Sequence, residues 1–379
     1  MEEENILEIV SFLLLLQETI EVKQILYQMC NSLDDFDKSE IYISLLPIVS
    51  SVCLGWIDKF QKHGKAVDLP DVQGVDFITM LKSVRIGLKL YSDKRVANAF
   101  KRLNTDANER KKMLETNYNF LQKFRVSVLG QPDLGIFTIN DMPYGNTSQM
   151  SIYLEGLFSL NKFETINQWG EGMKPIMIDY SQALSTFINS IATEFEENFT
   201  VDSTMKLNIS NYKLSYVDKF LMDTNRQNIL LGDLLLEAQL QLFNILCQNN
   251  FINVLLPNIF QSTGNLFYRS KLQSYLVSVH TIKKLVSKYS ESIDFQLVNE
   301  LEKIIEVKNN FFSANNQFRN NIFHYSITEI SFSNFSNPQN YFREFVESYI
   351  DISFDDFMKI IDEEIEKINR VVEQLIKYR

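Results

Sequence analysis

The sequence predicts a mainly α-helical protein with a helical N-terminal region and a C-terminal helical bundle. Two observations carry this prediction: hydrophobic residues make up 45% of the 379 residues, and only 12 Gly and 7 Pro are present to interrupt long helices. A chain of this length exceeds one ordinary core. Because residues 199–215 are rich in Asn, Ser and Thr, we expect one helical part over 1–200 and a second over 210–379.

The N-terminal part shows helical spacing of apolar residues in four places: 4–30, 38–62, 77–129 and 176–195. A loop is expected over 63–74, where Gly and Pro gather. The helical pattern weakens over 130–175, which contains turn signals such as Pro143-Tyr144-Gly145-Asn146. Short strands are possible in this irregular stretch, for example around 136–139.

The C-terminal part predicts helices over three further stretches: 216–260, 266–286 and 297–322. A polar, aromatic linker follows from 326 to about 349, and its rings either close a core or dimer interface or stack on bases. The final helix is expected to begin after Ser353, a good N-cap, with Asp355 and Asp356 in its first turn. Its apolar positions keep three-and-four spacing as far as Leu375.

Charge is distributed unevenly along the chain. The net charge of −11 argues against a protein that coats nucleic acid non-specifically. Within residues 82–125, however, basic residues outnumber acidic ones by about three to one. Such a run is either a solvated helix face or a surface that receives a polyanion. From it we take eight candidate RNA-binding residues: Lys82, Arg85, Lys89, Lys101, Arg102, Arg110, Lys111 and Lys112.

Other sequence features point to an intracellular protein without a cofactor. The three cysteines, Cys30, Cys53 and Cys247, form no CxxC pair, so we expect buried, reduced thiols and no zinc site. No dinucleotide-binding or P-loop fingerprint occurs. The N-terminus is acidic, and the apolar run 9–16 is too short to cross a membrane. We therefore expect a cytoplasmic protein with no membrane contact, no metal and no cofactor.

The strongest candidate site is the segment Arg319-Asn320-Asn321-Ile322-Phe323-His324. His324 follows Arg319 by five residues and is one of only three histidines. His63 lies in a Lys- and Gly-flanked loop and is expected to be exposed and inert. His280 lies in an apolar helix and is expected to be a core or interface residue. We therefore take Arg319, Asn320 and His324 as the candidate catalytic residues.

These residue types suit the cleavage of RNA, whose 2′-hydroxyl supplies the nucleophile. An imidazole with an ordinary pKa of about 6.5 transfers protons near neutral pH, and a guanidinium binds phosphate oxygens. The expected products are a 2′,3′-cyclic phosphate and a 5′-hydroxyl, and no metal is required. On an ideal helix Arg319 and His324 lie about 140° apart, a difficulty that a symmetric dimer partly removes. Asn320 shares a face with His324 and is placed to orient the imidazole or hold a phosphate oxygen.

This pattern of an arginine, a polar residue, three further residues and a histidine resembles the HEPN family of bacterial ribonucleases. The resemblance covers about residues 265–379, including the terminal amphipathic helix. It implies an all-α homodimer with a composite active site. It also implies a role in abortive infection, toxin–antitoxin or CRISPR-associated defence, with an antitoxin or another defence protein as partner. Some toxin members carry a Tyr two places after the His, which a partner modifies; here Ser326 holds that place and Tyr325 precedes it, which puts that mode of neutralisation in doubt.

A second class of function is a non-catalytic HEPN-like module that binds protein or RNA within a defence system. The cost to the cell separates the two classes. A nuclease is toxic on overexpression and loses that toxicity with His324→Ala, whereas a binding module is harmless in both forms.

Overall fold

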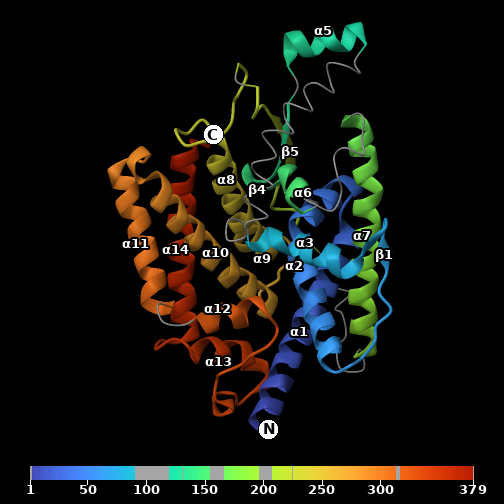
Figure 1. Cartoon of the computed structure of the whole chain (residues 1–379), viewed down its shortest axis with the longest axis vertical. Helices are drawn as coiled ribbons and strands as arrows, with labels where there is room; N and C mark the ends of the chain where they lie inside the picture. The colour runs from blue at the N-terminus through green and yellow to red at the C-terminus, as the bar shows by residue number, and fades with distance from the viewer. Residues whose placement is uncertain are drawn as a thin grey trace.

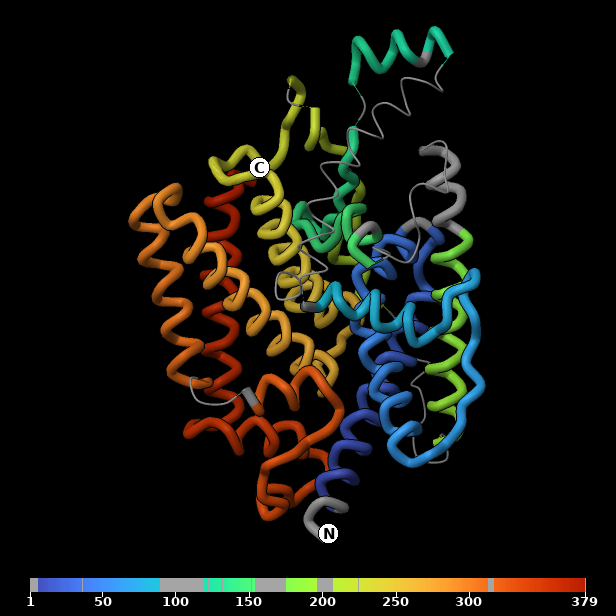
Figure 2. The backbone as a smooth tube through the Cα atoms, in the orientation of Figure 1, coloured from blue at the N-terminus to red at the C-terminus, as the bar shows by residue number. Residues whose placement is uncertain are grey.

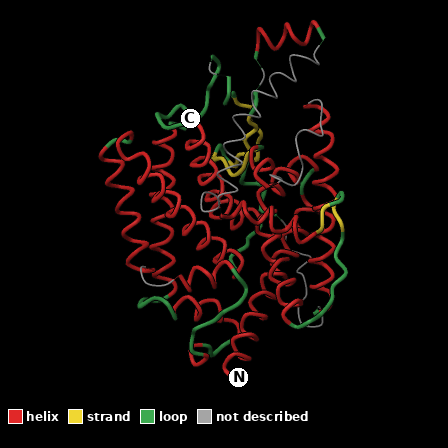
Figure 3. The backbone as a smooth tube through the Cα atoms, in the orientation of Figure 1, coloured by secondary structure: helices red, strands yellow, loops and turns green. Residues whose placement is uncertain are grey.

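The computed structural model describes residues 2–89, 119–130, 132–153, 166–195, 207–223, 225–312 and 316–378. The protein is mainly α, as predicted, with a few short strands (Figures 1 and 3). Its α-helices are α1 (Glu2–Ser32), α2 (Asp35–Lys62), α3 (Phe77–Lys89), α5 (Phe120–Leu129), α6 (Ser148–Tyr153), α7 (Ile166–Glu194), α8 (Leu236–Asn250), α9 (Leu256–Ile259), α10 (Asn265–Tyr289), α11 (Phe295–Phe312), α12 (Asn316–Phe323), α13 (Tyr341–Glu347) and α14 (Phe354–Ile376). Its strands are β1 (Asp71–Val72), β2 (Val75–Asp76), β3 (Leu134–Ile139), β4 (Met142–Asn146) and β5 (Leu214–Lys219).

The first two predicted helices are confirmed as α1 and α2, and they pack together with α7 (Figure 1). The Trp56 indole N–H of α2 donates to the Thr19 hydroxyl of α1 over 2.7 Å, so the pair buries its polar atoms in a satisfied form. The helical stretch Asp37–Lys62 is long and apolar enough to cross a membrane, but 89% of its most apolar window is buried inside the protein. This burial matches a core helix.

A small antiparallel sheet in the order β4-β3-β5 packs beside α8. The strand expected around 136–139 is confirmed as β3, whose six residues are all buried. The prediction of helix from residue 216 onward was wrong before α8, which begins at Leu236. The chain first forms β5, which pairs with β3 from Leu134↔Lys219 to Ile139↔Leu214. Because the partner strand supplies the hydrogen bonds of β5 from far away in the chain, tertiary pairing overrides the local pattern.

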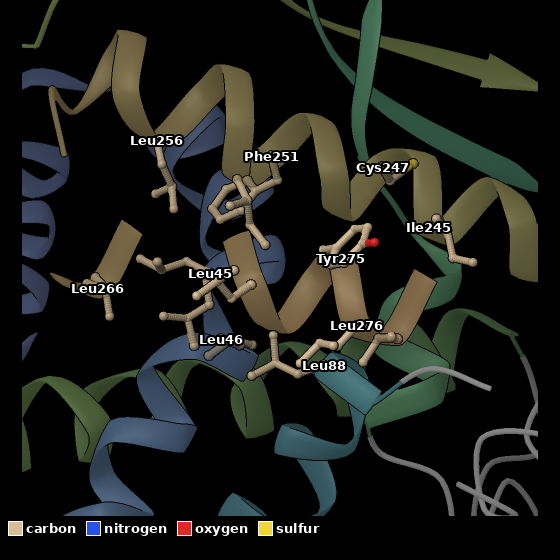
Figure 4. Close-up of a cluster of buried hydrophobic side chains, with 14 of the residues drawn as sticks. Leu45, Leu46, Leu88, Ile245, Cys247, Phe251, Leu256, Leu266, Tyr275 and Leu276 are labelled. Carbon is tan, nitrogen blue, oxygen red and sulfur yellow. The ribbon is translucent and has the colours of Figure 1, made fainter. Parts of the chain in front are cut away.

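Residues from both sides of the boundary predicted near 200–210 contribute to one hydrophobic core, which includes Leu7 and Ile376. Figure 4 shows part of it, where Leu45 and Leu46 of α2, Leu88 of α3 and Leu276 of α10 belong to one buried cluster. The strand β5 lies after that boundary and pairs with β3 before it. The division of the chain into two domains stays a prediction, but the two parts share a sheet and a core.

In the C-terminal half, α8, α10, α11 and α14 lie side by side (Figure 1). The start of α14 is confirmed, because the Ser353 hydroxyl accepts a hydrogen bond from the Asp356 N–H over 3.2 Å. Its predicted apolar positions are all buried: Phe357, Met358, Ile361, Ile365, Ile368, Val372 and Leu375. The helix ends at Lys377, which adopts the left-handed conformation typical of a C-cap.

The helix predicted over 297–322 is two helices in the structure, so this prediction was wrong. α11 ends at Phe312 and α12 begins at Asn316, although the Phe312 and Phe318 rings stack with centroids 4.5 Å apart. The three-and-four spacing of large apolar residues lapses between Phe312 and Phe318, and this gap was the available signal for two helices. Figure 2 shows α12 and α13 beside the N-terminal helix α1, which places the candidate site at the junction of the two halves of the chain.

Candidate functional site

Helix α12 turns its candidate residues to solvent and its apolar residues to the core. Arg319 and Asn320 are exposed, whereas Phe318 and Ile322 are almost completely buried. The inward Asn321 donates to the Tyr349 hydroxyl over 2.9 Å and to the Thr328 carbonyl over 3.1 Å. These contacts fix the rotation of α12 about its axis, so that its polar face stays accessible.

His324 follows the last residue of α12 and is also exposed. Its backbone N–H donates to the Asn320 carbonyl over 2.9 Å, which continues the helical hydrogen-bond pattern by one residue. Asn320 and His324 are therefore one helical turn apart on the exposed side. The Arg319 guanidinium carbon lies 5.4 Å from the centre of the Phe323 ring, which directs this side chain along the helix.

Basic side chains from three helices, Arg319 among them, interact electrostatically with His280, and we name this group the basic cluster. Its members are His280, Lys283 and Lys284 of α10, Lys308 of α11 and Arg319 of α12. Partial burial and repulsion by the four cations lower the pKa of His280 to about 4. Burial, Lys283 and Arg319 lower the pKa of Lys308 as well. Positive charge is concentrated here in an acidic protein, which is the electrostatic signature of an anion-binding site.

His280 was not predicted to belong to the site; its place in an apolar helix favoured a core or interface position. In the structure His280 is exposed, so that assignment was wrong for the core. The available signal was the spacing of His280, Lys283 and Lys284 at i, i+3 and i+4, which places three basic residues on one helix face. The lysine of α11 and the arginine of α12 join them only in three dimensions.

The carbonyl end of α12 is held by side chains from other helices. Arg269 of α10 donates to the carbonyls of Asn321 over 3.3 Å and of Ile322 over 3.1 Å. Gln273, one turn later on α10, donates to the same Ile322 carbonyl over 2.9 Å. These bonds satisfy acceptors that a helix leaves open at its C-terminal end.

Arg85 completes this cap and corrects one sequence-based prediction. Its guanidinium donates to the Phe323 carbonyl and is only partly exposed, and burial lowers its pKa. This position does not suit contact with RNA at the surface, so Arg85 has a structural role. Lys82, one turn earlier on α3, is exposed. Its charge acts on Asp58 and Asp76, and therefore it is partly compensated by the protein itself.

The remaining candidate RNA-binding residues contribute nothing further to the described site. Lys89 is the last residue of α3. Five candidates lie outside the described residues: Lys101, Arg102, Arg110, Lys111 and Lys112. Among the described residues, the positive charge near Arg319 therefore comes from the basic cluster on α10, α11 and α12.

The burial of the cysteines and of the aromatic residues in the linker can be compared with the expectations. Cys53 and Cys247 are buried as predicted, but the expectation for Cys30 was wrong because it is exposed at the end of α1. In the linker, Phe342 and Phe345 are buried in the core, while Phe332 is partly exposed. Within the described ranges, no three His, Cys, Asp or Glu side chains group as metal ligands.

The basic cluster makes a prediction about His280 that is independent of catalysis. We expect its imidazole to titrate near pH 4 and to be neutral at pH 7. Inorganic phosphate should raise this pKa, because a bound anion cancels part of the cationic repulsion. NMR titration of selectively labelled histidines measures both effects, and His280→Gln assigns the signal. A pKa for His280 at the ordinary value of about 6.5, unchanged by phosphate, would contradict the cluster.

We compared the chain with protein-family models, curated proteins and solved structures, and none of these three comparisons gives a match.

Proposed function

We propose that the protein is a metal-independent endoribonuclease of the HEPN type, acting in antiphage defence or as a toxin. One observation carries the proposal: Arg319 belongs to the basic cluster, and the adjacent Asn320 lies one helical turn before the exposed His324. Phosphate recognition and proton transfer are the two requirements of RNA cleavage through the 2′-hydroxyl, and this surface offers residues for both.

The proposed reaction uses each residue in a defined role. Arg319 holds the nonbridging phosphate oxygens and stabilises the charge that develops on them. His324 accepts the proton of the 2′-hydroxyl, whose oxygen attacks phosphorus as the bond to the 5′-oxygen breaks. The departing oxygen takes up a proton, which gives a 2′,3′-cyclic phosphate and a 5′-hydroxyl. Asn320 orients the imidazole or a phosphate oxygen.

A homodimer supplies the second proton-transfer group in this proposal. One imidazole acts as base and the imidazole of a second copy acts as acid, with both Arg319 side chains on the same phosphate. The lysines of the basic cluster extend the positive surface toward neighbouring phosphates of the RNA backbone. A cytoplasmic location and a restraining partner protein belong to the same proposal.

Cleavage of labelled RNA in excess EDTA tests the proposal directly. We expect the wild-type protein to cut RNA without added metal and to leave cyclic-phosphate ends, and we expect Arg319→Ala to lose this activity. The matched control is Arg343→Ala, because Arg343 is another arginine at the surface but pairs with Asp355 and does not belong to the basic cluster. Cleavage that requires metal, or that survives in Arg319→Ala, would overturn the proposed mechanism. If wild type leaves tRNA, rRNA and mRNA intact, a binding module becomes the better interpretation.

A further inference from the structure

The backbone around His324 is clamped on both sides by a buried network, which we name the α12 anchor. Before His324, the carbonyls of Ile322 and Phe323 accept bonds from Arg269, Gln273 and Arg85. After it, the Tyr325 hydroxyl donates to Glu18 over 2.7 Å. An exposed residue at the end of a short helix is usually free to fray, but here its neighbours on both sides are tied to other helices.

Glu18 of α1 is the centre of the α12 anchor. One carboxylate oxygen pairs with the Arg269 Nε over 2.6 Å, and the other accepts the Tyr325 hydroxyl. The Glu18 side chain is 0% exposed and that of Arg269 is 4% exposed. Burial raises the pKa of the Glu18 carboxyl, while the charge of Arg269 and the bond from Tyr325 oppose that rise. With both oxygens and the guanidinium occupied, the network has one geometry and is correspondingly rigid.

Packing around Tyr325 restricts the geometry of the α12 anchor further. The Arg269 guanidinium carbon lies 4.5 Å from the centre of the Tyr325 ring. The ring also meets α2 at Gly55, where an added Cβ would collide with it. The Ile327 N–H then donates to the Ser11 hydroxyl of α1 over 2.9 Å. Helix α1 therefore fixes the chain at two points after His324, one through Glu18 and one through Ser11.

We propose that Glu18 and Tyr325 are positioning residues, through which the N-terminal helix α1 holds His324 in its reactive position. This inference rests on the proposed function for its catalytic consequence, but its structural part can be measured alone. A displacement of about 1 Å of a reacting group can reduce a rate about 100-fold without any loss of binding. Loss of the anchor should therefore lower kcat while leaving KM almost unchanged.

The chain offers a matched pair of variants. Tyr325→Phe removes the hydroxyl that bonds Glu18, and Tyr180→Phe removes a hydroxyl that bonds Ser50 over 2.7 Å. Both tyrosines are buried, so Tyr180→Phe controls for the loss of a buried hydroxyl. Tyr325→Phe should cost somewhat more stability, because its partner is a carboxylate. Only the first alters the surroundings of His324. The experiment uses the full-length protein and compares wild type, Tyr325→Phe and Tyr180→Phe.

The first measurement is NMR of the histidine side chains, because the three imidazoles give a simple spectrum that His324→Gln assigns. We expect Tyr325→Phe to shift the His324 signal and its titration, and Tyr180→Phe to leave both unchanged. Glu18→Gln should shift the same signal, because it removes the charge that holds Arg269. A His324 signal that is identical in wild type and Tyr325→Phe would overturn the positioning role, whether or not the protein cuts RNA.

The second measurement is steady-state cleavage of RNA. We expect a fall in kcat of about 10- to 100-fold for Tyr325→Phe, with KM within about twofold, and wild-type values for Tyr180→Phe. Equal losses in both variants would show a general effect of stability and overturn the proposal. If wild type lacks ribonuclease activity, the proposed function fails, and the NMR result still decides whether α1 positions His324.

Discussion

Replacing His324 by alanine should reduce RNA cleavage by about 10²- to 10⁴-fold, the usual contribution of a positioned proton-transfer group. Because this side chain is exposed at the end of α12, the free energy of unfolding should change by no more than about 0.5 kcal/mol. Single-turnover cleavage and urea unfolding measure the two quantities on the same preparation. Activity and stability should thus separate cleanly at this position.

The control is His63→Ala, which removes an exposed histidine whose ring lies 3.5 Å from the Glu8 carboxylate and which belongs neither to α12 nor to the basic cluster. We expect it to keep full activity. In cells, wild type should be toxic on overexpression and His324→Ala should not. If His324→Ala cuts RNA as fast as wild type, the imidazole has no chemical role and the proposed mechanism fails.

The largest effect on stability is expected for Arg269→Ala. The variant leaves the Glu18 carboxylate buried without its cation and strips donors from the carbonyls of Asn321 and Ile322. Breaking one partner of a buried ion pair typically costs about 3–5 kcal/mol. Urea unfolding followed by circular dichroism measures the change as a lower midpoint with an unchanged slope.

Two further variants distinguish the effect of an unpaired buried charge on stability from the effect of lost contacts. Lys359→Ala removes an exposed ion pair with Asp356 and should cost about 1 kcal/mol or less. Adding Glu18→Leu to Arg269→Ala removes the uncompensated carboxylate and should recover part of the stability. Equal losses for Lys359→Ala and Arg269→Ala would mean that the Glu18–Arg269 pair is not buried as the structure has it.

Local patterns predicted the long helices well, because the periodic spacing of apolar residues in each helix shows which face is buried. In α14 the apolar positions recur every three or four residues, and Ser353 marks the start, so both the helix and its N-cap were predictable. The strand β5 has no such periodic pattern. Its six residues pair with β3, where Thr138 bonds Ser215 at a separation of 77 positions, and no local window contains that information.

The candidate site divides in the same way. Arg319, Asn320 and His324 were predictable because they lie together in the sequence and their side chains carry the chemistry. The residues that fix and surround them were not, since Glu18, Arg269 and Arg85 approach α12 from distant segments. For Arg85, the local pattern indicated a solvated basic run, whereas tertiary packing turned this one arginine inward to a helix end.

The contact between α1 and the segment after α12 also determines when the α12 anchor can form during synthesis. Glu18 is separated in sequence from Arg269 by 251 positions and from Tyr325 by 307. At about 5–20 residues per second, a ribosome needs roughly 15–60 s to make the chain between Glu18 and Tyr325. The Glu18–Arg269 pair can form once Arg269 has been made, whereas the Tyr325 hydroxyl reaches Glu18 only later. The α12 anchor is therefore complete only after the synthesis of Tyr325, and the backbone around His324 is held on both sides only from that point.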